Sequence, residues 1–213
     1  MSFAFLAACA LQSSYAKIHG KSIVHALVVL NKAVICDLSW FVSQISTAGC
    51  VHLLEATIWD AEDAQLSLWC DASDIGLGFW SPAHHIGLIS PLDLSVHHDT
   101  IFFNEALCVL AALLWTSRLP AIPQHLAIYT DSLNTVQIFC TLHADPPYNS
   151  ILFLAVEIML EAKIDLCVFH VPGFNNFIAD ALSCLLPDIA VSHVPGLSIS
   201  TFIPTRDVLG ALS

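Results

Sequence analysis

Four acidic residues stand inside otherwise apolar stretches of the chain, where carboxylates can bind cations or take part in proton transfer. Asp71 ends the run LSLWCD, Glu105 lies in FFNEALCVLAAL, Asp131 follows HLAIYT, and Asp180 lies in FIADALS. A buried carboxylate is unfavourable unless a hydrogen-bond donor or a cation compensates its charge. Four converging carboxylates would repel one another, and oxygen-rich clusters of this kind suit Mg²⁺ or Mn²⁺. The four acids therefore predict a divalent-metal site if the fold brings them together.

Each acid also has a purely structural interpretation. Asp71 is suited to accept hydrogen bonds from the backbone of its own turn, and Asp131 to cap a helix that begins near Leu133. Glu105 would interact favourably with the N-terminal end of a helix dipole, and Asp180 is suited to a solvated helix position. Both interpretations stay open here, because only the fold can bring residues so distant in sequence into one place.

The overall charge limits the partners that the chain can attract. Charged residues make up only 11% of the sequence. There are 6 Lys and Arg and 18 Asp and Glu, which gives a net charge of -12. Such a surface repels nucleic acid at long range. A nucleic-acid function would therefore need cations from metal ions or from a separate basic partner domain.

The hydrophobic patterning predicts an α/β domain with a mixed sheet. Three consecutive strands indicate an antiparallel meander, and the later alternation of strands and helices indicates parallel crossovers. The expected strands are 66–71, 75–80, 85–90, 125–132 and 164–173, and the expected helices are 102–118, 133–142, 146–163 and 175–186.

The chain divides by composition into three parts. Apolar residues at helical spacing over 22–48 predict an N-terminal helical extension, with a boundary near residue 60. We expect residues 1–60 to form this helical or connecting segment, 61–188 the α/β domain, and 189–213 an irregular tail. Pro187 is expected to stop the last helix.

The cysteines, histidines and apolar runs exclude several other classes. None of the eight Cys forms a C-x-x-C pair, so they read as small buried hydrophobic residues in a reducing compartment, the cytoplasm or the nucleus. The pairs His84-His85 and His97-His98 fit no zinc-binding spacing. No apolar run reaches the roughly 18 residues of a membrane span, so no membrane partner is expected.

Four stretches together resemble a known family. CDASDIGLGFW, FFNEALCVLAAL, IYTDSLNTV and FHVPGFNNFIADALS are similar to the ribonuclease H domain of retroelement reverse transcriptases, most closely those of long-terminal-repeat and related fungal-type elements. The resemblance covers about residues 66–186, and residues 15–60 resemble the connecting segment of such polyproteins. It implies a ribonuclease H-like mixed five-stranded sheet flanked by helices.

The resemblance also implies an activity and a set of site residues. The family's Asp-Glu-Asp-Asp set falls on Asp71, Glu105, Asp131 and Asp180, which are the four acids selected above. The implied reaction is hydrolysis of the RNA strand of an RNA–DNA hybrid, leaving a 5′ phosphate, with two Mg²⁺ or Mn²⁺ ions about 4 Å apart. Asp71 would bridge both ions, Glu105 and Asp131 would hold one, and Asp180 the other.

The chain departs from the family pattern in its cations. Cellular members carry a His in the loop before the last Asp, whereas this loop is VPGFNN, and Cys184 stands where the family usually has Arg or Lys. Asn175 and Asn176 are the predicted neutral contacts to a nucleic-acid backbone. A polymerase domain, absent from this sequence, would be a partner supplied elsewhere. The alternative function is a catalytically inactive remnant that acts as a connection or interaction module.

Overall fold

A computed structural model describes residues 59–92, 100–144 and 148–205, together with five residues nearer the N-terminus. The chain divides into two units, Met1–Ile58 and Trp59–Ser213, which are described separately. In the first unit the described residues are helical and exposed, and they are Lys32, Ile35, Ser39, Val42 and Ser43. They fall within the predicted helix over 22–48, and the rest of that prediction lies outside the described residues.

The second unit is built on a mixed sheet with the strand order β5-β4-β1-β2-β3-β6. Its strands are β1 (Leu66–Ala72), β2 (Gly76–Ser81), β3 (Ile86–Pro91), β4 (His125–Thr130), β5 (Asp165–His170) and β6 (Ser198–Thr201). The first three strands form an antiparallel meander, whereas β4 runs parallel to β1 and β5 runs parallel to β4. The predicted change from antiparallel to parallel pairing is therefore confirmed.

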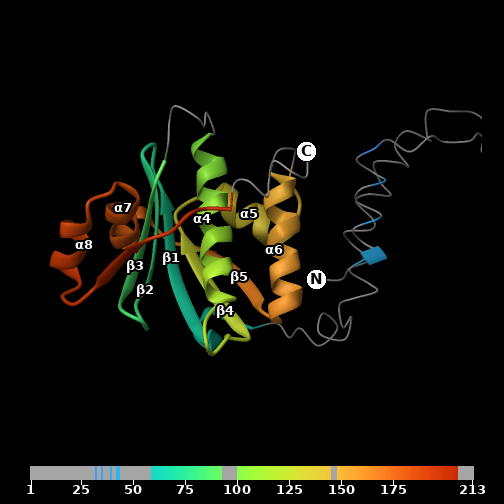
Figure 1. Cartoon of the computed structure of the whole chain (residues 1–213), viewed down its shortest axis with the longest axis horizontal. Coiled ribbons are helices and arrows are strands. Elements are labelled where there is room, and N and C mark those ends of the chain that lie inside the picture. Colours follow the sequence, from blue (N-terminus) through green and yellow to red (C-terminus); the bar gives the residue numbers. More distant parts are fainter. Residues whose placement is uncertain are drawn as a thin grey trace, which may run out of the picture. The chain divides into compact units, whose positions relative to one another are not determined.

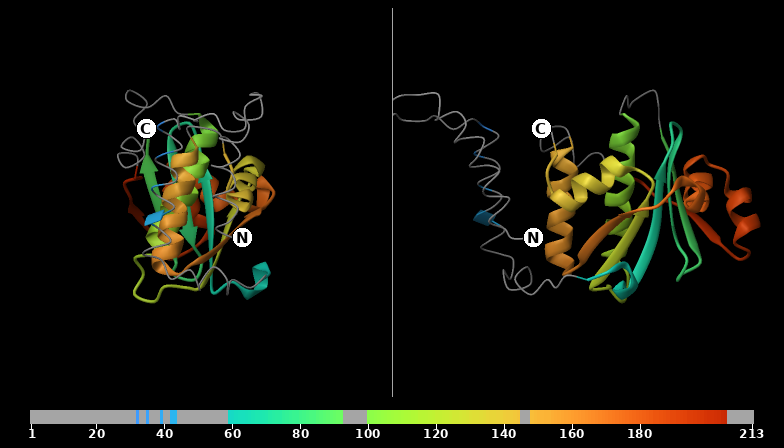
Figure 2. Two further views of the ribbon diagram at one scale, coloured as in Figure 1. Left: turned by 90° about the vertical axis from the view of Figure 1, so that its right-hand side faces the viewer. Right: turned by 180° about the vertical axis from the view of Figure 1, so that it is seen from behind.

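Helices cover both faces of this sheet (Figure 1). The helices are α4 (Ile101–Thr116), α5 (Leu133–Thr141), α6 (Asn149–Ala162), α7 (Phe177–Ser183) and α8 (Pro187–His193), with the short 3₁₀ turns η1 (Ala61–Asp63) and η2 (Gly173–Asn175). In the views of Figure 2, α4, α5 and α6 lie on one side of the sheet, and α7 and α8 lie on the other.

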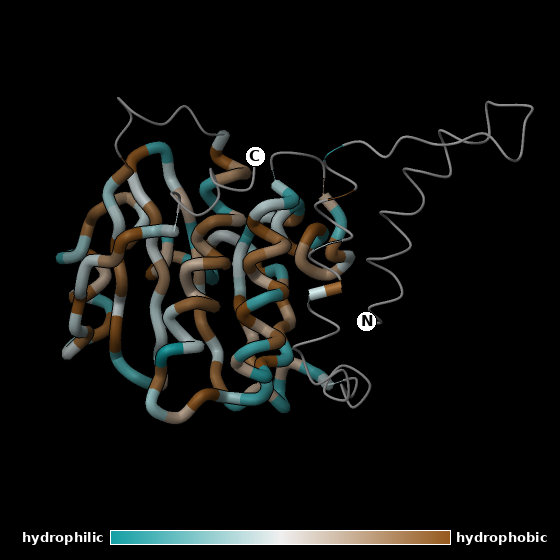
Figure 3. Tube along the Cα trace, turned by 45° about the vertical axis from the view of Figure 1, so that its right-hand side comes forward, coloured by the Kyte–Doolittle hydropathy of each residue, from teal (hydrophilic) through white to brown (hydrophobic). Residues whose placement is uncertain are grey.

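The main core lies between the sheet and α4. Leu68 and Cys70 of β1 are fully buried there with Leu107 and Leu110 of α4. Because side chains alternate along a strand, Trp69 and Asp71 face the opposite side, toward α7. Hydrophobic residues, brown in Figure 3, recur through the helices and strands. One face of β1 is therefore buried in the main core, and Asp71 lies on the other face.

The prediction of an irregular tail over 189–213 was wrong for residues 189–201, and residues 206–213 of it lie outside the described residues. Pro187 begins α8 instead of ending all regular structure, because a helix's first turn does not use the N–H that proline lacks. After α8, β6 pairs in parallel with β3, so the sheet has six strands instead of five. No helix in the described part of the chain is both long and apolar enough to cross a membrane.

Candidate active site

The carboxylate of Asp71 is the buried centre of the site. Asp71 lies near the end of β1, opposite Gly78 of β2, and only 8% of its surface is exposed. The Ser183 hydroxyl of α7 donates a hydrogen bond to Asp71 Oδ2 at 2.5 Å. Among the described residues, no Lys or Arg forms an ion pair with Asp71, so Asp71 is a buried acid compensated by a neutral donor.

Glu105 reaches the site from the second turn of α4. Its side chain is half-buried, and the Thr135 hydroxyl of α5 lies 3.4 Å from Glu105 Oε2. Burial raises the pKa of Glu105, hydrogen bonds from Ser132 and Thr135 lower it, and the charge of Asp131 raises it. Glu105 therefore interacts with the first turn of α5 and with the acid that precedes it.

Asp131 follows β4 and is exposed, and its capping interpretation was wrong. The N-cap of α5 is Ser132, whose side chain accepts a hydrogen bond from the Thr135 N–H at 3.4 Å. Asp131 is thus not the cap of α5. The next loop approaches it closely, because a Cβ added to Gly173 of η2 would lie 3.1 Å from Asp131 Oδ2.

Asp180 lies on the exposed side of α7, one turn before Ser183. Its backbone carbonyl oxygen is 2.9 Å from the Ser183 hydroxyl, and the Cys184 thiol lies 3.9 Å from Asp180 Oδ1. The same turn of α7 therefore carries one acid and the hydroxyl that binds another.

The four acids interact electrostatically. The pKa of Asp71 is raised from 3.8 to about 7, chiefly by burial. The Ser183 hydrogen bond opposes this shift, and the charges of Asp131, Asp180 and Glu105 each add to it. Three acids from three separate parts of the chain thus act on a single carboxyl group, as like charges do when they are close.

Glycine in β2 allows α7 to lie against the sheet next to Asp71. A Cβ on Gly78 would overlap the backbone of Leu182 and Ser183, and one on Gly76 would lie 2.5 Å from the Ser183 carbonyl oxygen. Only glycine permits this approach of strand and helix. The Ser183–Asp71 hydrogen bond depends on it.

The two predicted nucleic-acid contacts differ in accessibility. Asn176 is 1% exposed, and its side-chain amide donates to the Cys70 carbonyl at 2.9 Å. It joins the start of α7 to β1 and presents no group to a nucleic acid in this conformation. Asn175 is exposed on η2.

Sequence reasoning missed the hydroxyls that hold the acids. The sequence did not predict a role for Ser183, although it stands three residues after Asp180 and therefore on a neighbouring part of the helix surface. Ser132 and Thr135 were likewise assigned no contact with Glu105. Only the helix spacing of Ser183 was visible in the sequence, because the other contacts join separate elements.

The chemistry of the donor set fits a hard divalent cation. The four side chains offer only carboxylate oxygens, which Mg²⁺ and Mn²⁺ prefer, and bound cations would relieve the repulsion that raises the pKa of Asp71. Within residues 59–92, 100–144 and 148–205, no three or more His, Cys, Asp or Glu are placed closely enough to hold a metal ion. The charges of Asp131, Asp180 and Glu105 nevertheless act on Asp71.

The strand order and directions given above decide the fold. The fold is ribonuclease H-like. No family model matches the chain, and no curated protein matches it. Similar solved structures include ribonuclease H1 of Halobacterium salinarum, with 17% identity over 59% of this chain and 98% of that chain at a TM-score of 0.45.

Two further structures show similarity at the same level. LC11-RNase H1 in complex with an RNA/DNA hybrid has 16% identity over 60% of this chain and 99% of that chain, with a TM-score of 0.47. The N-terminal RNase H domain of Rv2228c from Mycobacterium tuberculosis has 16% identity over 61% of this chain and 99% of that chain, with a TM-score of 0.42.

Proposed function

We propose that this domain is a divalent-metal-dependent endonuclease of retroelement origin that hydrolyses the RNA strand of RNA–DNA hybrids. The observation that carries the proposal is the placement of Asp71, which is 8% exposed and accepts a hydrogen bond from Ser183, in the same turn of α7 as Asp180. Asp131, Asp180 and Glu105 lie near enough for their charges to raise its pKa. An acid cluster with this charge is unfavourable in a protein that makes no use of a cation. A structural role for each acid separately does not account for their convergence.

The four acids, each from a different part of the fold, are the proposed metal ligands. Asp71 would contact both ions, Glu105 and Asp131 one of them, and Asp180 the other. When bound, Mg²⁺ or Mn²⁺ ions would lower the pKa of the attacking water and stabilise the leaving 3′ oxygen. Ser183 would keep Asp71 oriented, and its hydrogen bond favours the ionised form that binds cations.

Contacts to the hybrid would come from the exposed η2 turn. Asn175 would offer a neutral hydrogen bond to the nucleic-acid backbone. Beside it, Phe174 is 79% exposed and offers a ring for stacking. Gly173 places this turn next to Asp131, so a strand that contacts η2 would pass by the acids.

Few cations of this domain are available to hold phosphates. Arg118 and Lys163 are the only Lys or Arg among residues 59–92, 100–144 and 148–205, which hold 12 Asp and Glu. Phosphate contacts supply much of the affinity of nucleic-acid binding. We therefore propose that a basic partner, such as a polymerase domain supplied elsewhere, strengthens binding to the hybrid.

A cleavage assay tests the function. Full-length protein is incubated with an RNA–DNA hybrid labelled on the RNA strand, in Mn²⁺ and in Mg²⁺, beside duplex DNA and duplex RNA. We expect cleavage of the hybrid RNA alone, with 5′-phosphate products, and loss of cleavage in Asp131→Asn. The matched control is Asp188→Asn on α8, an acid outside the cluster, which should cleave normally.

The outcome separates the two candidate functions. Folded wild-type protein that cleaves no hybrid in either metal would contradict the nuclease proposal and favour the inactive remnant. Equal cleavage by Asp131→Asn and wild type would show that the acid cluster is not the active site.

A further inference from the structure

A line of aromatic side chains crosses the sheet on the face opposite α4. Strand register sets Trp80 of β2 opposite Trp69 of β1, Trp69 opposite Tyr129 of β4, and Tyr129 opposite Phe169 of β5. Paired residues of neighbouring strands point to the same face. Together with Trp59, which precedes η1, these side chains are called the aromatic row.

The rings of the aromatic row contact one another in sequence. Trp69 lies 5.6 Å from Trp80 and 4.7 Å from Tyr129 between ring centroids, and Tyr129 lies 5.6 Å from Phe169. Trp59 meets Phe169 edge-on at 6.3 Å. The row is therefore a continuous aromatic surface from β2 to β5.

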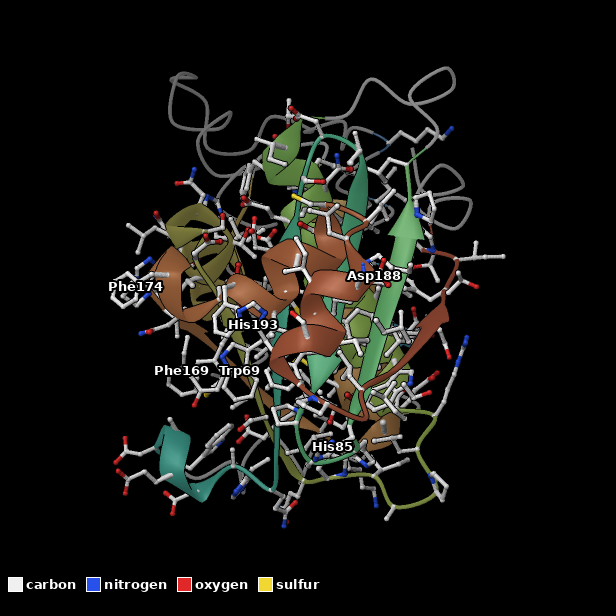
Figure 4. The ribbon with its side chains drawn as sticks, turned by 90° about the vertical axis from the view of Figure 1, so that its left-hand side faces the viewer. Trp69, His85, Phe169, Phe174, Asp188 and His193 are labelled. Atoms are coloured by element: carbon white, nitrogen blue, oxygen red, sulfur yellow. The ribbon has the colours of Figure 1, made fainter. Side chains whose placement is uncertain are left out.

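The middle of the row is partly accessible, whereas Trp59 is 8% exposed and Trp80 packs against Leu182 and its neighbours. Trp69, Trp80, Tyr129 and Phe169 are all half-buried. Helix α7 packs on β1, β2 and β3, whereas α5 packs on β4 and β5 from the opposite face, where its Ile138 and Phe139 join the main core. Figure 4 shows the Trp69 and Phe169 side chains on this face of the sheet, beside α7.

Acids stand at the Trp59 end of the row. Asp60, Glu62 and Asp63 follow Trp59 in and beside η1, and Asp165 begins β5 opposite His125, on which Trp59 stacks at 4.9 Å. Among the described residues of the second unit, the cations are Arg118 and Lys163, which follow α4 and α6 on the other face of the sheet. This charge disfavours a nucleic acid and favours a cationic occupant.

The chemistry of rings bordered by acids favours one kind of cation. Positive groups are attracted to the faces of Trp and Tyr, and the planar guanidinium of arginine can also stack on them while it pairs with a carboxylate. The strongly hydrated ammonium of lysine gains less from the rings. The row and its acids are therefore complementary to arginine.

We infer that the aromatic row is a docking surface for an arginine-rich segment of a basic partner protein. The guanidinium groups would stack on the rings, and the acids of η1 and Asp165 would pair with further cations of the segment. The inference concerns the side of the sheet away from α4 and does not depend on nuclease activity. Such a partner would also supply the positive charge that the described domain lacks.

Two synthetic peptides of equal length and charge test this inference, one an Arg-Gly repeat and the other a Lys-Gly repeat. Binding to the full-length chain is measured by calorimetry and by tryptophan fluorescence. We expect the Arg peptide to bind at least about tenfold more tightly than the Lys peptide, since several cation–π contacts add to the shared charge attraction.

Variants of the aromatic row test whether the arginine preference comes from its rings. The double variant Tyr129→Leu/Phe169→Leu keeps apolar side chains and removes two rings, so it should fold, as its melting temperature will show. It should lose the preference for arginine while its affinity for the Lys peptide is unchanged. Phe102→Leu, which removes a half-buried ring on α4 on the other face of the sheet, should keep the full preference.

Several results would overturn the inference. Equal affinity of wild type for both peptides would do so, as would an arginine preference that persists in the double variant. Binding of a single-stranded oligonucleotide that the double variant abolishes would assign the row to nucleic acid instead. A dimer in ultracentrifugation that the double variant dissociates would assign it to a second copy of this chain.

Discussion

The Ser183 hydroxyl donates a hydrogen bond to Asp71 Oδ2 at 2.5 Å and thereby joins α7 to the end of β1. Ser183 lies one turn after Asp180, whose charge also acts on Asp71. A single short helix thus supplies one acid of the cluster and positions another. Any shift of α7 should therefore change both acids together.

Replacing Ser183 tests this positioning. In Ser183→Ala the pKa of Asp71 should rise further, because the lost hydrogen bond favours the ionised form. We expect about 2 kcal/mol lower stability at pH 8, a typical value for a hydrogen bond to a charged group, and a smaller loss at pH 5. Urea unfolding at both pH values measures the effect.

A matched serine provides the control. Ser192 of α8 is exposed, and its hydroxyl bonds only within its own helix and the adjacent His193. Ser192→Ala should change stability little and equally at both pH values. In the cleavage assay, the acidic limb of the pH–rate profile should move to higher pH in Ser183→Ala, and an unmoved limb would contradict the positioning role.

Asp71→Asn should stabilise the metal-free protein in a pH-dependent way. The pKa of Asp71 is about 7 in the folded protein against an ordinary 3.8, so between these values the folded state holds a proton that the unfolded chain releases. The contribution of Asp71 to the free energy of unfolding of the wild type therefore falls between about pH 4 and about pH 7. Above about pH 7 this contribution no longer changes with pH.

The variant lacks this dependence. The difference in stability between Asp71→Asn and wild type should be near zero at pH 4 and positive at pH 8. Its upper limit is on the order of 4 kcal/mol, because each pKa unit corresponds to about 1.4 kcal/mol. Mn²⁺ should raise the melting temperature of wild type and not of the variant. An equal shift in both proteins would count against Asp71 as a ligand.

Gly78→Ala should displace α7 from the sheet. The added methyl group would meet the backbone of Leu182 and Ser183, which cannot yield as a side chain can. We expect destabilisation of about 1–3 kcal/mol or more, and a loss of cleavage that exceeds what stability explains. Gly87→Ala is the control, since its methyl group would meet only side-chain atoms, the nearest at 3.1 Å.

Phe174→Ser should weaken binding of the hybrid without changing the fold. Phe174 is 79% exposed, so its replacement removes little packing, and stacking on a base contributes about 1–3 kcal/mol. We expect roughly tenfold weaker binding of a labelled hybrid in Ca²⁺, measured by fluorescence anisotropy. Ile203→Ser, at a 92% exposed position away from the site, should bind normally, and equal binding by both variants would exclude the contact.

The sequence determined the local structure and the choice of acids. Alternating and helical apolar spacing predicted β1 to β5 and the helices α4 to α7, because these periods reflect which face of each element is buried. The same patterning isolated Asp71, Glu105, Asp131 and Asp180 as charges in apolar surroundings. The effect of Pro187 depends on its position within a helix, and β6 is short and mostly exposed, so the sequence pattern did not predict α8 and β6.

Only the tertiary structure decided how these residues act. The contacts of Ser183 with Asp71, of Thr135 with Glu105 and of Asn176 with Cys70 join residues 30 to 112 positions apart. Hydropathy records whether a side chain is buried and not which distant group it meets. The pKa of a carboxyl group depends on its burial and on the groups near it. The sequence therefore supplied the acids, and the fold determined their protonation.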